Sequence, residues 1–208
     1  MLKKIGWFMF ALLCILISSY PIFYLVYGDS FGLLTSKTPE QLANMVWKAA
    51  FYTHIVPGGI ALLVGWVQFS KKWWTARPDV HRLLGKIYVL SALPSALAGI
   101  YIGLLAVGGP VGRAGFANGG VIWFYSTLQA FLKIKKGDVP GHQKMMIYSY
   151  ATCFGAVTLR FYLPLLIMLF NGEFEPAYRI VAWMAWLPNI IVAYWIVSKL
   201  EQKTLVIS

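Results

Sequence analysis

Histidines are the residues of this sequence whose type and spacing best suit chemistry. His81 and His142 each come shortly after a proline and an aspartate, so each is expected in the first turn of a helix. Two imidazoles that face each other at one depth can ligate a haem iron axially. Gly85 lies one helical turn beyond His81, and Ser95 and Gly99 extend the same stripe of small residues. Such a stripe lets a flat macrocycle approach a helix, and it equally lets a second helix approach.

These residues predict a haem b site with His81 and His142 as axial ligands and Gly85 beside the macrocycle. The alternative interpretation makes both histidines polar residues at helix starts. Zinc is a further alternative, because Asp79 and Asp138 would add ligand types that zinc accepts. His54 lies about 22 Å, at 1.5 Å per residue, from the end of its helix that is expected on the same membrane side as His81 and His142, so a site of three histidines is excluded.

A second candidate site involves His54 and Arg160, both within apolar segments. Pro57 follows His54 by three residues and weakens the helix there. Arg160 would cost about 2.5–3.5 kcal/mol to insert at mid-membrane, so it must face protein, water or an anion. The two residues predict a ligand site for a lipid head group, a carboxylate or a quinone. The alternative is that Arg160 clamps freed backbone carbonyls.

The elements that must position these residues are long apolar helices. The chain has 208 residues, of which 59% are hydrophobic and 12% are charged. A helix that is apolar on all sides is buried in protein or lipid. We therefore expect an all-α integral membrane bundle, with residues 1–208 forming a single transmembrane domain. Its six spans are expected at residues 5–27, 46–69, 83–107, 115–131, 145–170 and 177–197.

The distribution of positive charge sets the expected orientation. The formal net charge is +11, and most Lys and Arg residues fall on one side of the six expected spans. That side is the cytoplasmic one under the positive-inside rule, which places both termini in the cytoplasm. Membrane topology accounts for the charge, so nucleic acid is not an expected partner. Thr38, Pro39 and Gln41 have the spacing of a helix start, which predicts a short surface helix before the second span.

An internal repeat is indicated when the chain is compared with itself at an offset of 61 residues. Spans two and three would then form one hairpin, and spans four and five a second hairpin of the same orientation. The expected core is a bundle of these four helices, flanked by the first and last spans. The residues that coincide include Gly58 with Gly119, Gly59 with Gly120, Gln68 with Gln129, Lys72 with Lys133, His81 with His142 and Tyr101 with Tyr162.

The run His81–Gly85, the pair His142 and Met146, and Arg160 together resemble a bacterial membrane-protein family described as domain of unknown function 2306. The resemblance extends from the second span to the fifth. It implies a bacterial multi-pass protein of the cytoplasmic (inner) membrane, and it implies no activity. The chain is also faintly similar to ascorbate-reducible transmembrane b-type cytochromes. Only His81 and His142 match the ligands of that family, so this resemblance implies one haem.

Two classes of function follow, and whether the protein is an enzyme is left open. The first is electron transfer through one haem between His81 and His142. The alternative is a non-enzymatic module: an accessory subunit in a larger complex or homo-oligomer, or a binder of lipid or a small anion near His54 and Arg160. Secondary transport is a third possibility, but no carboxylate is expected inside the membrane to couple an ion.

Overall fold

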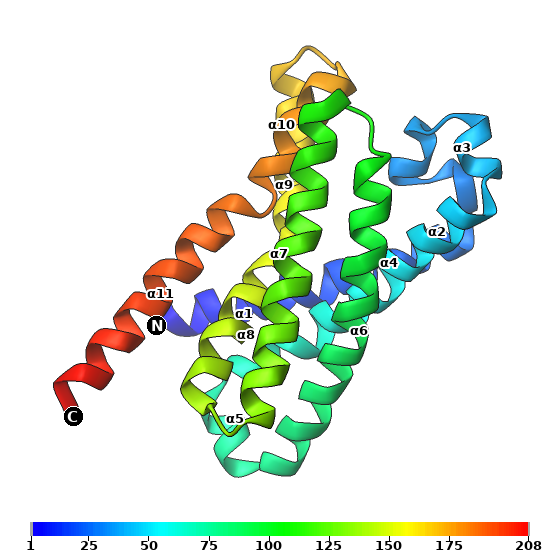
Figure 1. The fold of residues 1–208 in the computed structure, drawn as a ribbon. Coiled ribbons are helices and arrows are strands. Elements are labelled where there is room, and N and C mark those ends of the chain that lie inside the picture. The colour runs from blue at the N-terminus through cyan, green and yellow to red at the C-terminus, as the bar shows by residue number, and fades with distance from the viewer. Residues whose placement is uncertain (1, 208) are drawn as a thin grey trace. The chain divides into compact units, whose positions relative to one another are not determined.

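The structure is a computed structural model that describes residues 2–207, with side chains described for residues 4–70 and 73–202. All regular elements of this part of the chain are helices (Figure 1), which confirms the all-α prediction. In chain order the elements are α1 (Leu2–Ser18), α2 (Tyr20–Tyr27), η1 (Gly28–Ser30), η2 (Gly32–Ser36), α3 (Pro39–Ala43), α4 (Met45–Gly65), η3 (Trp66–Phe69), α5 (Lys71–Ala76), α6 (Pro78–Leu104), α7 (Gly109–Lys135), α8 (Val139–Cys153), α9 (Gly155–Leu169), α10 (Phe174–Met184) and α11 (Leu187–Ile207).

Five helical segments among the described residues are long and apolar enough to cross a membrane. The remaining long helix, α7, has 27 residues and would extend about 40 Å at 1.5 Å per residue. Its glycines, Asn118 and Gln129 lower its mean hydropathy. The count of six spans and the cytoplasmic placement of both termini therefore stay predictions. The five segments are Lys4–Ser36, Met45–Phe69, Pro78–Leu104, Val139–Leu169 and Phe174–Gln202.

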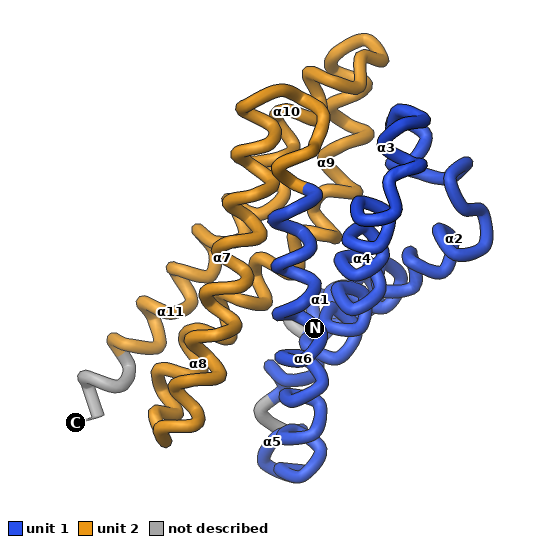
Figure 2. Tube along the Cα trace, turned by 45° about the vertical axis from the view of Figure 1, so that its right-hand side comes forward, with its two compact units in different colours: residues 1–102 blue, residues 103–208 orange. Residues whose placement is uncertain are grey.

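The chain forms two compact units, residues 1–102 and residues 103–208 (Figure 2). Unit 1 contains α1 to α6, and unit 2 contains α7 to α11. The expected single domain and four-helix core each combine segments from both units, so they stay predictions. The boundary between the units falls near the end of α6, within the third expected span. The helix starts Pro78 and Val139 also differ by 61 residues (139 − 78 = 61), and the repeat itself stays a prediction.

Unit 1 is built around α4. The bend between α1 and α2 lies over Gly59, where a Cβ atom would come within 2.9 Å of the carbonyl oxygen of Ser18. A glycine there lets the two helices approach closely. A separate core of aromatic residues joins α2, η2 and α4, with Tyr24, Trp47 and Phe51 all buried. These contacts hold the long connection 28–44 against α4.

The predicted surface helix before the second span is confirmed as α3. The hydroxyl of Thr38 accepts a hydrogen bond from the backbone N–H of Gln41 at 3.3 Å, and Pro39 occupies the first helical position. Asn44 then caps α4 in the same way, because its side-chain oxygen accepts from the N–H groups of Val46 and Trp47. Both caps satisfy donors that a helix start leaves unpaired.

Unit 2 depends on close packing of α7 against α10. A Cβ atom at Gly115 would lie 2.8 Å from the Cβ of Ala182, and one at Gly119 would lie 2.9 Å from the ring of Trp186. The indole N–H of Trp186 donates to the carbonyl oxygen of Gly115 at 3.0 Å. The glycines of α7 thus lower its hydropathy and allow this contact at the same positions.

Candidate functional site at the basic turns

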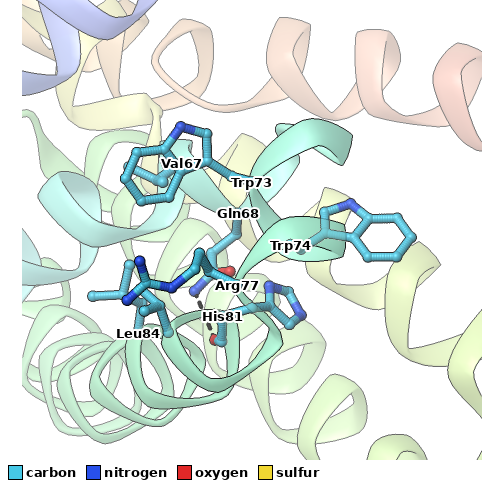
Figure 3. Close-up of a pocket in the computed structure, with 8 residues that line it drawn as sticks. Val67, Gln68, Trp73, Trp74, Arg77, His81 and Leu84 are labelled. Atoms are coloured by element: carbon cyan, nitrogen blue, oxygen red, sulfur yellow. Dashed lines mark hydrogen bonds between the residues drawn. The ribbon is translucent and has the colours of Figure 1, made fainter.

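The turn between α4 and α6 contains a small open hollow of about 10 Å³, which has room for about one water-sized group. Residues of η3, α5 and the start of α6 line it, together with Arg77 between α5 and α6 (Figure 3). The polar side chains of the lining are an amide, a guanidinium and an imidazole. The residues that line the hollow are Val67, Gln68, Trp73, Trp74, Arg77, Val80, His81 and Leu84.

His81 reaches this hollow because it is the fourth residue of α6, as the sequence predicted for a residue in the first helical turn. The side-chain amide of Gln68 donates to the carbonyl oxygen of His81 at 3.1 Å, which fixes η3 against the start of α6. The ring of Trp74 lies 6.4 Å from the His81 ring, centroid to centroid. The half-buried imidazole thus lines the hollow beside the indole of Trp74.

Arg77 supplies the positive charge of the hollow. Its Nε atom is 3.8 Å from a carboxylate oxygen of Asp79, and both side chains are well exposed, at 65% and 72%. An exposed ion pair at that distance contributes little and leaves the guanidinium able to bind other anions. The guanidinium has a planar set of donors that matches phosphate and carboxylate oxygens.

Two exposed tryptophans border the same hollow, with 53% of Trp73 and 40% of Trp74 accessible. Figure 3 shows their rings extending to opposite sides of the polar group. Tryptophan favours the boundary between head groups and acyl chains, because one end of the ring is apolar and the other donates a hydrogen bond. The hollow therefore combines a positive centre with side chains suited to a membrane surface.

His142 occupies the equivalent position in unit 2, as the fourth residue of α8. Its Nδ1 atom lies 2.8 Å from the carbonyl oxygen of Ala130 on α7. A carbonyl accepts only, so Nδ1 carries the proton and Nε2 has the lone pair in the neutral ring. Metal-ligating histidines are commonly held in this way.

The turn that precedes His142 is held by Asp138. Its carboxylate accepts from the N–H of Gly141 at 2.8 Å and pairs with Lys133 at 3.0 Å. The Gly141 N–H, followed by Lys133, lowers the pKa of Asp138 below its ordinary value. The carboxylate thus stays ionised at the start of α8, where a helix favours negative charge.

His54 lies away from both turns, within α4. Its Nδ1 atom is 2.9 Å from the carbonyl oxygen of Ser95, and its ring packs on Gly99, where a Cβ atom would be 2.7 Å from Nδ1. Ser95 and Gly99 therefore serve helix packing, the second of the two uses predicted for the small-residue stripe. At Gly85 a Cβ atom would meet only the Gln68 amide nitrogen, 4.0 Å away.

Arg160 lies in α9. One of its terminal nitrogens, Nη1, donates to the carbonyl oxygen of Ala156 at 2.6 Å, one turn earlier on the same helix. The predicted clamp concerned freed backbone carbonyls, whereas Ala156 lies within the same helix, so the clamp stays a prediction. His54 belongs to unit 1 and Arg160 to unit 2, as do His81 and His142 respectively. A site shared by either pair stays a prediction.

One comparison with known proteins identifies a family. Residues 51–197, well over half of the chain, match the family model described as "Predicted membrane protein (DUF2306)". The chain belongs to this family. The match begins within α4 and ends within α11, so it covers His54, His81, His142 and Arg160. No curated protein and no solved structure matches the chain significantly.

Membership in the DUF2306 family confirms the first resemblance that the sequence indicated, whereas the likeness to b-type cytochromes is not shown. Among the described residues, no group of three or more His, Cys, Asp or Glu side chains lies close enough to hold a metal ion. The zinc alternative therefore has no supporting geometry. A haem iron needs only two axial histidines, so the absence of a group of three ligands among the described residues does not bear on the haem prediction.

Several residues of the candidate site carried no signal of their own in the sequence. From the sequence alone, Arg77 is one of many basic residues on the expected cytoplasmic side. Trp73 and Trp74 are expected at a membrane interface. Ser95 reads as one small residue in a stripe, yet it holds His54. The one usable signal was the shortness of the segment between the end of the second span and Pro78. A segment of that length must reverse direction within a few residues, so its side chains are expected to lie close together.

Proposed function

We propose that this protein is a membrane-embedded binding module that holds an anionic head group at the α4–α6 turn. The single observation that carries the proposal is the hollow in which Arg77, His81 and Gln68 meet two exposed tryptophans. The proposal keeps the anion-binding class predicted from the sequence, and it moves the site from His54 and Arg160 to this turn.

The chemistry of the lining favours a phosphate that belongs to a lipid. A guanidinium and an imidazole recognise phosphate oxygens through charge-assisted hydrogen bonds. Val67, Val80 and Leu84 supply apolar surface beside these groups, and the tryptophans suit the head-group region. An anionic phospholipid offers both the phosphate and the chains that such a surface accepts.

The location of the turn supports the same proposal. We place the protein in the bacterial inner membrane with both termini cytoplasmic, because the basic turns then face the leaflet that carries anionic lipid. The bilayer itself is the partner in this proposal. Participation in a larger complex or a homo-oligomer is a separate prediction, which the mass of the intact particle in a native spectrum would test.

Native mass spectrometry of the purified protein tests the proposal directly. The probes are phosphatidylglycerol, zwitterionic phosphatidylcholine and inorganic phosphate. We expect retained phosphatidylglycerol in the wild type and about tenfold weaker retention in Arg77→Gln, because a hydrogen bond to a charged group contributes about 1.5–3 kcal/mol. Inorganic phosphate that displaces the lipid would identify a free anion as an equal ligand.

Lys199→Gln is the matched control. Lys199 is an exposed residue near the end of α11, and its replacement removes the same single charge. Equal losses of lipid in the two variants would show that net charge alone attracts the lipid and would overturn the proposed site. Equal retention of the two lipids by the wild type would overturn it as well.

Electron transfer through one haem is the second candidate, and one observation favours it. The bond from His142 to the Ala130 carbonyl leaves Nε2 as the ring atom available to an iron. A reduced-minus-oxidised spectrum of protein expressed with added haem tests this candidate. A b-type band that disappears in both His81→Ala and His142→Ala supports it, and a spectrum without a band rejects it.

A further inference from the structure

Two long apolar segments of unit 2 are each interrupted near the middle. Val139–Leu169 breaks between α8 and α9 at Phe154, and Phe174–Gln202 breaks between α10 and α11 at Ala185. Pro188 contributes to the second break, because it has no N–H to donate to the carbonyl oxygen four residues earlier. Irregular backbone therefore occurs halfway along two candidate membrane spans.

The two breaks meet each other. A Cβ atom at Gly155 would lie 3.1 Å from the carbonyl oxygen of Ala185, so the missing side chain lets this carbonyl approach α9. The hydroxyl of Thr158 donates to the same carbonyl oxygen. The side-chain amide of Asn189 donates to the Thr158 hydroxyl oxygen at 3.1 Å and to the Ala185 carbonyl oxygen at 3.0 Å. Polar groups from three segments thus surround one point.

The helix ends at this point favour a positive charge. Phe154 is the C-cap of α8, and Ala185 is the C-cap of α10. The C-terminal end of a helix carries partial negative charge on its last carbonyl groups. Discontinuous membrane helices use carbonyls of this kind to coordinate cations. Arg160 lies about 200° around α9 from Thr158, and it donates to the carbonyl oxygen of Ala156.

We propose that Thr158, Ala185 and Asn189 form a binding site for a sodium ion. The Thr158 hydroxyl has two other acceptors on its own helix side, the carbonyl oxygens of Gly155 at 3.3 Å and Phe154 at 3.4 Å. When it donates to one of these, its lone pairs and the Ala185 carbonyl oxygen can face a cation. Turning the Asn189 amide over adds its oxygen as a third ligand, and water completes the shell.

Size and charge both favour sodium. Sodium has nearly the radius of calcium, whose oxygen ligands lie at about 2.3–2.6 Å and are therefore roughly 3.3–3.7 Å apart when at right angles. The Asn189 amide nitrogen, whose place the oxygen would take, is already 3.1 Å from the Thr158 oxygen and 3.0 Å from the Ala185 oxygen. The hydroxyl, carbonyl and amide ligands are neutral, which suits a monovalent ion. Such a site binds sodium without a carboxylate ligand.

Binding of radiolabelled sodium to the purified protein tests the site. The protein is kept in detergent with N-methylglucamine as the only other cation, and bound label is counted as unlabelled NaCl is added. We expect saturable binding that NaCl displaces and choline chloride does not. Thr158→Val removes the hydroxyl and keeps the shape of the side chain, so the affinity for sodium should fall about tenfold or more.

Three matched variants accompany this measurement. Thr158→Ser keeps the hydroxyl and should keep the affinity within about twofold. Thr152→Val makes the same change at a threonine whose hydroxyl donates to the Tyr148 carbonyl oxygen within α8, at 3.0 Å, and should bind sodium as the wild type does. Asn189→Asp puts a charged oxygen at the third ligand position and should bind sodium several-fold more tightly.

A wild type without saturable sodium binding overturns the proposal. Wild-type affinity in Thr158→Val, an equal loss in Thr152→Val, or equal displacement by potassium chloride also overturns it. If Thr158→Val does not fold, Asn189→Asp decides, because an affinity no higher than that of the wild type rejects the third ligand. None of these measurements involves Arg77, so they are independent of lipid retention at the α4–α6 turn.

Discussion

The imidazole of His142 and the carbonyl oxygen of Ala130 are joined by a hydrogen bond of 2.8 Å that closes the second hairpin at its basic turn. In the first hairpin the corresponding closure uses the side chain of Gln68 and the carbonyl oxygen of His81, at 3.1 Å. Both turns are therefore held by one side-chain donor and one backbone acceptor, but the donor comes from opposite helices. In unit 1 the imidazole is consequently left to line a hollow, whereas in unit 2 it is part of the closure.

His142→Ala should loosen the α7–α8 turn because it removes this bond. A neutral hydrogen bond contributes about 0.5–1.5 kcal/mol, so the expected loss of stability is of that size. The measurement is the apparent melting temperature in detergent. Gln143→Ala is the control, since Gln143 is the exposed neighbour. Equal effects of the two substitutions would contradict a specific role for the His142 bond.

Asp138 should make the start of α8 sensitive to acid. Its pKa is lowered in the folded protein by the Gly141 N–H and by Lys133. A carboxylate with a lowered pKa adds stability above its ordinary value of about 3.9, and that stability is lost as the pH falls through the lower folded value. Hydrogen–deuterium exchange of residues 133–143, scaled to the intrinsic exchange rate at each pH, should therefore rise as the pH drops below about 4.

Asp138→Asn separates the two contributions of this residue. Its amide oxygen can still accept from Gly141, but it has no charge for Lys133 and cannot titrate. The variant should be less protected than the wild type at neutral pH, and its protection should not change further in acid. If wild type and variant were to lose protection in parallel as the pH fell, another group would be responsible.

The sequence predicted well those features that depend on local chemistry. Thr38 and Pro39 specified a helix start, and the positions of His81 and His142 in their helices followed from the prolines and aspartates before them. Apolar length specified most of the spans. These features are predictable because they involve residues only a few positions apart, so no knowledge of packing is required.

The sequence did not predict features that depend on which faces meet. Ser95 and Gly99 were expected to border a macrocycle or a second helix, and only the structure shows that His54 occupies them. The sequence did not predict that Arg77 shares a hollow with His81. More than one arrangement of the turn satisfies the positive-inside rule. Arg160 was open to two interpretations because a carbonyl clamp and a ligand site require the same guanidinium.

Gly115→Ala should weaken the packing of α7 on α10. The added methyl group would lie 2.8 Å from the Cβ of Ala182 and 3.0 Å from that residue's carbonyl carbon, and the latter cannot easily move. Overpacking of this kind costs about 1–3 kcal/mol. The expected result is a lower melting temperature and faster proteolysis of unit 2. Gly6→Ala is the matched control, because a Cβ atom at Gly6 meets nothing within 4 Å.

Cysteine accessibility in intact cells should decide whether α7 crosses the membrane. The native cysteines, Cys14 and Cys153, are both buried and can be replaced by alanine first. Single cysteines at Gly109 and Lys136 then report the two ends of α7. Under the six-span prediction, an impermeant maleimide labels the cysteine at position 109 in intact cells and labels the one at position 136 only after the membrane is opened. Labelling of both positions under the same condition would place both ends of α7 on one side.

The protein would then have five spans and its termini would lie on opposite sides, so the turn holding His142 would no longer share a membrane face with the hollow at His81. That outcome would also exclude a haem between the two histidines, because the two rings would then lie at opposite membrane surfaces.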